Sequence, residues 1–221
     1  MRTIPHMKKK YTVSFLITAH LACFCLLLLA GCLPGSKPPQ LIEQYTLEYA
    51  PPAVPAGTAF PDAIRVDRFS VAQAYNGTSM LYRPSAYKLG AYNLDRWRTN
   101  PGDMVSDFLI RDLRNSGMFA GVFSSREAET ARFKIEGGVA EFLEVDDQAS
   151  GSALLTLSVA LIDTKQEGVA KRLVFQKRYS SAEPLTGQTP VALAQGMSAA
   201  VRRLSEQIMK DIFEAVRRLE Q

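Results

Sequence analysis

Residues 151–163 read GSALLTLSVALID, and this stretch decides the fold class. Its apolar side chains occupy every second position, so an extended strand here would have one apolar face and one polar face. The positions concerned are Leu155, Leu157, Val159 and Leu161. Similar runs at 133–145 and 173–179 flank it, joined by short polar turns. Because strands joined by short turns pair antiparallel, the sequence predicts an antiparallel meander over residues 132–179.

Two glycines interrupt the first run of this meander. Gly137-Gly138 indicates a bulge or a close approach of another backbone. A bulge would turn Glu141, which otherwise falls on the apolar face, toward the solvent. The alternative is a buried carboxylate at Glu141.

Two helices are expected, one before the meander in the sequence and one after it. The first spans residues 100–117, with Asn100 as N-cap, Pro101 in the first turn and Gly117 as C-terminal cap. Its polar face, which includes Asp112, is expected to be solvated. The second helix opens at Thr189-Pro190 and carries an apolar stripe as far as residue 219. We expect this stripe to lie across the sheet; coiled-coil pairing is the alternative.

The region before the first helix reads as short strands. Alternation predicts strands at 44–49, 64–69 and 87–92. Asn76-Gly77 separates two strand-like runs and predicts a tight hairpin between them. Together these elements predict one α+β domain over residues 44–221. Its sheet would be mainly antiparallel, with two α-helices packed on one face as a two-layer sandwich.

The N-terminal segment has the layout of a secretory signal. Lys8, Lys9 and Lys10 precede an uncharged apolar run that ends in Leu29-Ala30-Gly31-Cys32. This ending resembles the lipobox of bacterial lipoproteins, which implies cleavage after residue 31 and acylation of Cys32 by chains such as palmitate. Residues 1–31 are then a signal peptide and residues 32–43 a lipidated tether. The alternative is an uncut transmembrane helix, since about 17 apolar residues approach the length that spans a bilayer.

Composition excludes several classes of function. Four of the 26 basic residues and none of the 22 acidic ones lie in residues 1–31, so the remaining chain is formally neutral and nucleic acid is not expected as a partner. Both histidines, His6 and His20, also lie there, as do Cys23 and Cys25. Without His or free Cys, catalytic triads and zinc sites of the usual kinds are excluded. We expect no enzyme activity, no metal and no cofactor; a hydrolase that uses paired carboxylates is the enzyme alternative.

The order of these elements resembles the ABC-type transport auxiliary lipoprotein family over residues 32–219. The most specific part is the aromatic segment from Tyr82 to Trp97, which leads into the first helix. The resemblance implies a non-catalytic accessory lipoprotein of a system that moves lipids or other hydrophobic molecules between the inner and outer membranes. Its partners would be an MCE-domain protein with its ABC permease and ATPase. An assembly lipoprotein that supports an outer-membrane complex is the alternative, and a homo-oligomer is left open.

Location and contact residues complete these expectations. Leu33 follows Cys32, where an Asp would resemble an inner-membrane retention signal, so we expect a lipid anchor in the outer membrane facing the periplasm. Trp97, between Arg96 and Arg98, is a candidate exposed partner contact. The alternative is that Trp97 packs over the sheet edge and the arginines are solvated.

One acidic cluster invites a metal-site interpretation. Asp146-Asp147 together with Glu144 could hold a calcium ion. We expect turn residues instead, because neighbouring strand side chains point to opposite faces.

Overall fold

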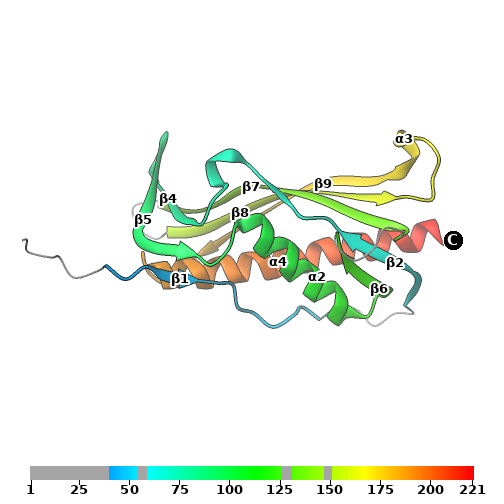
Figure 1. Ribbon diagram of the computed structural model, residues 1–221, viewed down its shortest axis with the longest axis horizontal. Helices are drawn as coiled ribbons and strands as arrows, with labels where there is room; N and C mark the ends of the chain where they lie inside the picture. The colour runs from blue at the N-terminus through cyan, green and yellow to red at the C-terminus, as the bar shows by residue number, and fades with distance from the viewer. Residues whose placement is uncertain (1–39, 54–58, 126–130, 147–150) are drawn as a thin grey trace, which may run out of the picture. The chain divides into compact units, whose positions relative to one another are not determined.

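The computed structural model describes residues 40–53, 59–125, 131–146 and 151–221. The chain divides into two units, Met1–Gln40 and Leu41–Gln221, and the second unit holds the fold (Figure 1). Its strands are β1 (Glu43–Tyr45), β2 (Phe60–Val66), β3 (Ser70–Val71), β4 (Ser79–Ser85), β5 (Lys88–Trp97), β6 (Phe119–Ser124), β7 (Phe133–Asp146), β8 (Gly151–Asp163) and β9 (Leu173–Pro184). Its helices are the 3₁₀ turn η1 (Gln73–Tyr75), α2 (Pro101–Ser116), the single turn α3 (Val169–Arg172) and α4 (Pro190–Leu219).

The antiparallel meander is confirmed. β8 pairs with β7 on one side, with Val139 opposite Leu157, and with β9 on the other, with Leu155 opposite Ser181. The alternating apolar side chains of β8 are all buried, as their period of two predicts. Local sequence therefore determines this half of the sheet.

The rest of the sheet corrects the prediction of a mainly antiparallel two-layer sandwich. The second edge of β7 pairs in turn with β2, β3 and β4, all parallel to it. β6 joins β2 and β1 joins β5, also in parallel. Among the described residues, five of the eight strand pairings are parallel, so the fold is a mixed nine-stranded sheet with helices. Parallel neighbours need long crossover connections, and α2 lies within the one that joins β2 to β6.

The hairpin predicted at Asn76-Gly77 is wrong. Residues 73–75 form η1, β3 pairs with β7, and Gly77 does not have the positive φ that a type I′ turn requires. Asn76 instead accepts a hydrogen bond from the side chain of Asn100 over 2.8 Å. The hairpin of this region lies one step later, between β4 and β5, and Tyr87 in its turn has φ +66°.

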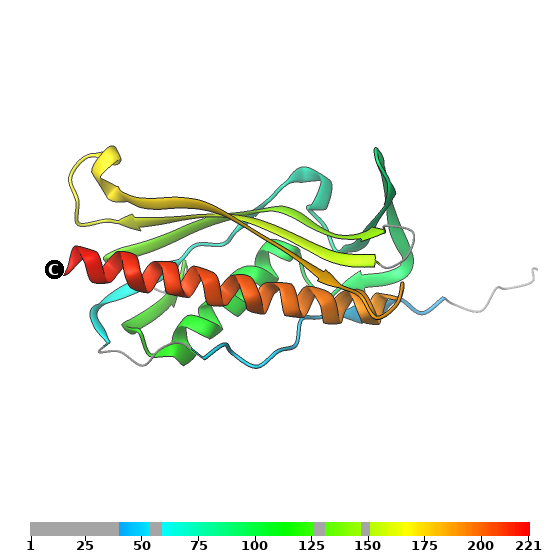
Figure 2. The same cartoon turned by 180° about the vertical axis from the view of Figure 1, so that it is seen from behind.

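Both long helices are confirmed, including their ends. The Asn100 side chain accepts a hydrogen bond from the Gly102 amide over 2.9 Å, and Gly117 ends α2 with φ +64°. Thr189 caps α4 through the Ala192 amide, with a distance of 3.2 Å. Both helices lie on the same side of β7, β8 and β9 (Figures 1 and 2). The stripe of α4 therefore covers the sheet, and its buried members form part of the core.

In β7, the position where another segment approaches the backbone and the position of the bulge lie a few residues apart. A Cβ on Gly137 would lie 2.3 Å from the ring of Phe69, so another segment does approach the backbone there. The register shift lies between Val139 and Glu141. Glu141 is turned outward, where it accepts a hydrogen bond from Thr156 over 2.7 Å and lies 3.5 Å from Arg83. Its outward position is confirmed, and the alternative of a buried carboxylate is wrong.

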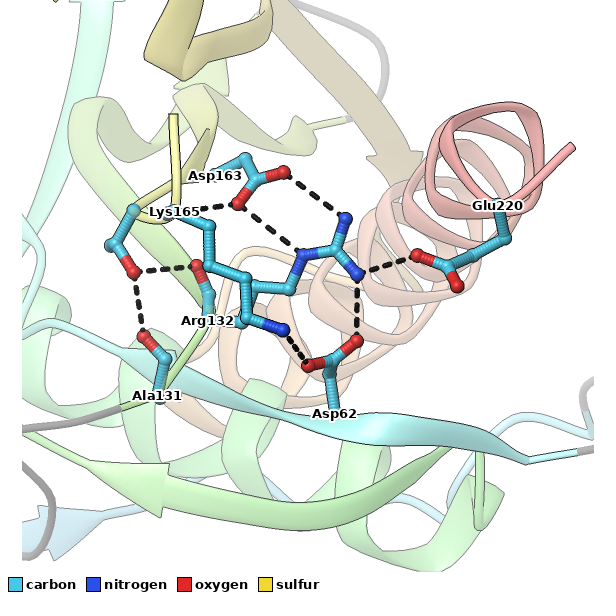
Figure 3. A network of polar contacts seen from close by, with 7 residues as sticks. Asp62, Ala131, Arg132, Asp163, Lys165 and Glu220 are labelled. Carbon is cyan, nitrogen blue, oxygen red and sulfur yellow. Dashed lines mark hydrogen bonds and ion pairs between the residues drawn. The ribbon is translucent and has the colours of Figure 1, made fainter. Parts of the chain in front are cut away.

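A cluster of charged side chains joins four separate parts of the fold at one end of the sheet (Figure 3). Arg132, directly before β7, lies 2.7 Å from Asp62 of β2, 3.3 Å from Asp163 of β8 and 2.5 Å from Glu220 after α4. Lys165 also contacts Asp62 over 2.9 Å. Burial opposes the charge of Arg132, but the three carboxylates outweigh it and raise the pKa of its guanidinium. The cluster ties the C-terminal end of α4 to the sheet.

Candidate interaction surface

The predicted contact at Trp97 is corrected by its position. The indole ring is 2% exposed and packs edge-on against Phe142, with ring centroids 5.2 Å apart. Trp97 ends β5, where its backbone amide donates to the Thr78 carbonyl over 2.7 Å. A ring enclosed in this way is part of the core and does not present a surface to a partner.

The two arginines beside Trp97 have different roles. Arg96 folds back along β5, and its guanidinium donates to the backbone carbonyls of Tyr92 and Asn93 over 2.6 and 3.1 Å. These bonds keep the guanidinium on its own strand. Arg98 is exposed and bonds the side chain of Gln44. Of the three candidate residues, Arg98 is the one with a side chain available at the surface.

Cys32, the predicted lipid attachment residue, lies outside the described residues. Among the described residues, no helix has both the length and the apolar character needed to cross a bilayer.

A polar groove runs along the exposed side of α2. Its larger part has a volume of about 430 Å³ and is lined by Asp107, Ile110, Arg111, Arg114, Asn115 and Ser124. A second hollow of about 200 Å³ shares three of these residues and extends toward Arg68 and Ser125. We call this feature the α2 groove. Its guanidinium, carboxylate and amide groups suit contact with a polar or charged partner surface rather than with an acyl chain.

Asp112 orients Arg111, one of the residues that line the α2 groove. Its carboxylate is fully buried and accepts hydrogen bonds from the hydroxyl groups of Tyr49 and Ser205 over 2.8 and 2.6 Å. It also accepts two from Arg111, at 3.0 and 2.7 Å. Burial, together with the charge of Asp112, raises the pKa of the Tyr49 hydroxyl. Asp112 was expected on a solvated face, and that expectation is wrong.

Two aromatic rings and a backbone carbonyl hold Arg111 in place. Its guanidinium lies 4.3 Å from the ring centre of Tyr49 and 4.4 Å from that of Phe108. It also donates to the Tyr49 carbonyl over 3.1 Å. One feature of the sequence could have indicated the burial of Asp112. It directly precedes Leu113 and follows Leu109 by three positions, so it borders the apolar face of α2.

One small void lies in the described core between the helices and the sheet. This apolar void between α2, α4 and β8, bounded by Val105, Leu157 and Val201 among others, has a volume of about 10 Å³. A space of this size holds about one water molecule at most. This part of the described core therefore has no room for an acyl chain.

Glu144 is buried beside Tyr92. Its carboxylate is 2% exposed and accepts a hydrogen bond from the Tyr92 hydroxyl over 2.7 Å. Burial is the main reason that the pKa of Glu144 is raised; the bond from Tyr92 opposes this shift and the charge of Asp146 adds to it. Asp147 lies outside the described residues, and those described contain no group of three or more His, Cys, Asp or Glu side chains able to hold a metal ion.

Comparison with known proteins identifies relatives of both sequence and fold. A family model described as an ABC-type transport auxiliary lipoprotein component matches residues 45–209. A crystal structure of a DUF330 protein from Xanthomonas campestris has a TM-score of 0.71 at 19% identity, and covers 81% of this chain and 98% of its own. A second crystal structure, of an uncharacterized protein, has a TM-score of 0.61 at 11% identity over 78% of this chain and 99% of its own. At these identities, the structures show a shared fold. No curated protein matches the chain.

Proposed function

The chain belongs to the ABC-type transport auxiliary lipoprotein family, and from this premise we propose that it is the periplasmic accessory component of an MCE-type ABC transport system. Such a system moves lipids or other hydrophobic molecules between the inner and outer membranes. In this proposal, the protein is non-catalytic. Cys32 carries the lipid anchor, and the anchor lies in the outer membrane because Leu33 rather than Asp follows the cysteine.

One observation favours an interaction component over a lipid carrier. A carrier domain must enclose acyl chains, and pockets for small ligands usually measure several hundred Å³. The void between α2, α4 and β8 measures about 10 Å³, whereas the larger part of the α2 groove measures about 430 Å³, is open to the surface and is lined mainly by polar and charged residues. We therefore propose that the partner proteins carry the hydrophobic cargo. This domain binds those proteins through its surface.

The proposed partners are the MCE-domain protein and, through it, the permease and ATPase. Arg98 remains the proposed contact next to the buried Trp97, because its guanidinium is exposed. The α2 groove is the second proposed contact, since Arg111 is already oriented by Asp112 before any partner binds. Preorganised charged groups lower the cost of ordering side chains on association.

The proposal is tested by mild crosslinking of the tagged full-length lipoprotein in its own membranes, followed by affinity purification and mass spectrometry. Recovery of an MCE-domain protein with its permease supports the proposal. Recovery of an outer-membrane assembly partner without either of them would overturn it in favour of an assembly lipoprotein. Arg98→Glu should reduce the yield of the MCE-domain protein, while Arg202→Glu on the exposed side of α4 serves as the matched control.

A further inference from the structure

Exposed apolar side chains gather at one end of the described unit. Seven large hydrophobic side chains of the described residues are exposed: Leu41, Ile42, Tyr87, Leu89, Leu173, Val191 and Leu219. Leu41 and Ile42 lie directly before β1, and Tyr87 lies in the β4–β5 turn. Leu89 is the second residue of β5, and Val191 lies in the first turn of α4. Leu173 and Leu219 belong to β9 and the C-terminal end of α4, at the opposite end in both views (Figures 1 and 2).

Strand direction explains why these elements share an end. β1 is parallel to β5, with Glu43 opposite Asp95. The residues before Glu43 therefore lie toward the start of β5, which is the β4–β5 turn. α4 starts beside β1, where Ser198 accepts a hydrogen bond from the Glu48 amide over 3.0 Å. We call Leu41, Ile42, Tyr87, Leu89 and Val191 the apolar end.

Tyr87 is the most prominent side chain of the apolar end. It is fully exposed, and its φ of +66° is a conformation that residues other than glycine rarely adopt. The strain holds an aromatic side chain at the tip of a hairpin, where it packs on little of its own domain. Lys88 follows it, and Tyr beside Lys is typical of side chains that sit at the interface between lipid and water.

The anchor limits how far the apolar end can be from a membrane. Eight residues separate Cys32 from Leu41, and a fully extended chain over these nine Cα–Cα steps spans about 30 Å. At this distance, the bilayer that holds the anchor is always within reach of the apolar end. We infer that Tyr87, Leu89, Leu41, Ile42 and Val191 insert at the surface of that bilayer and set the orientation of the domain; this inference depends on the lipid anchor at Cys32 that we propose above.

Membrane contact at this end would leave the other surfaces free. Apolar side chains that insert at the boundary of headgroups and acyl chains lie about 5–10 Å deep, which suits a hairpin tip but not a whole domain. The residues that line the larger part of the α2 groove come from α2 and β6 and not from the apolar end, so the groove stays available to a protein partner. Docking therefore fixes the orientation of the domain, whereas the tether alone limits only its distance from the membrane.

The test places a fluorescent probe at each end of the full-length lipidated protein. Tyr87→Trp reports on the apolar end, and Leu219→Trp is the control at the opposite end, where the parent side chain is also apolar and exposed. The native Trp97 stays in both variants as a constant buried background. The proteins are reconstituted into vesicles of phosphatidylethanolamine and phosphatidylglycerol with or without brominated acyl chains, which quench indole fluorescence on contact.

We expect bromine to reduce the added fluorescence of Tyr87→Trp about twofold and to leave that of Leu219→Trp unchanged, because the docked tip lies at the acyl boundary. The fluorescence of Leu41→Trp should be quenched in the same way. Adding Tyr87→Gly and Leu89→Ser to the Leu41→Trp variant should diminish this quenching. Equal quenching at both ends, or none at Tyr87→Trp, would overturn the inference. If the protein failed to sediment with the vesicles at all, the lipid anchor itself would be refuted, so the two failures are distinct.

Discussion

Ser205 of α4 donates a hydrogen bond to the carboxylate of Asp112 of α2 over 2.6 Å, inside the core and across 93 positions of sequence. Ser205→Ala would remove one of the donors that stabilise a fully buried carboxylate. We expect the free energy of unfolding to fall by about 1–3 kcal/mol, as is typical for a buried acceptor that loses a partner. Urea unfolding would measure it, with the exposed Gln207→Ala as control; equal stability of both variants would contradict this role.

Arg132 should be the most sensitive residue of the charged cluster. Arg132→Met leaves the nearly buried carboxylate of Asp163 without its guanidinium, which should lower the free energy of unfolding by about 3 kcal/mol. Glu220→Gln removes only a partner that is 37% exposed, so its cost should stay below about 1 kcal/mol. Thermal unfolding of both variants measures the contrast, and similar losses would show that the cluster is not organised around Arg132.

The same cluster predicts a loss of stability in acid. Burial raises the pKa of Asp62, but hydrogen bonds from Lys165 and Arg132 outweigh it and bring the pKa below its ordinary value of 3.8. The stabilisation is therefore present above pH 3.8 and is lost as the pH falls through the lowered value. Asp62→Asn should remove this part of the acid dependence, which a urea titration at several pH values would reveal.

Glu144 should act in the opposite direction. Its pKa in the folded protein is raised above the ordinary value of 4.5, chiefly by burial. Its contribution to stability is then complete below pH 4.5 and declines as the pH rises through the raised value. We expect Glu144→Gln to gain stability relative to the parent protein between acidic and neutral pH. A constant difference across this range would show that Glu144 titrates as it does in the unfolded chain.

Gly102 provides a test in which packing and helix propensity predict opposite signs. Alanine within a helix is favoured over glycine by about 1 kcal/mol. A Cβ at Gly102, however, would lie 2.3 Å from the Phe69 carbonyl and 2.7 Å from a methyl group of Val71. We expect Gly102→Ala to destabilise the protein by about 1–3 kcal/mol, because α2 must move away from β3. Gly77→Ala, with no atom within 4 Å, should be nearly neutral and is the control.

The helices and the meander could be predicted because their determinants are local. Asn100, Pro101 and Gly117 each act within one turn of α2, and the alternation in β8 acts over neighbouring residues. The parallel half of the sheet depends instead on pairs such as Ile64 with Phe133, and alternation gives the face of a strand but not its partner. The sheet was therefore predicted with the correct strands in its C-terminal half and the wrong overall pairing.

The candidate surface was less predictable for the same reason. Arginines on both sides of Trp97 favour an exposed site, but alternation along β5 also allows the ring to point inward, and Phe142 of β7 supplies the contact that decides it. The α2 groove depends on β6 packing beside the helix, which no local pattern encodes. Asp112 borders the apolar face of α2, and its burial follows only from the partners that Tyr49 and Ser205 provide.

The shared edge of β7 also determines the order in which the protein can fold. During synthesis, β2, β3 and β4 leave the ribosome well before the strand with which all three pair. The meander and α4 form from contacts that are close in sequence, whereas the N-terminal strands must close long loops to reach β7. The C-terminal half is therefore the template on which the N-terminal half assembles. In a nascent chain, β2, β3 and β4 therefore have no β7 partner until synthesis has passed residue 146.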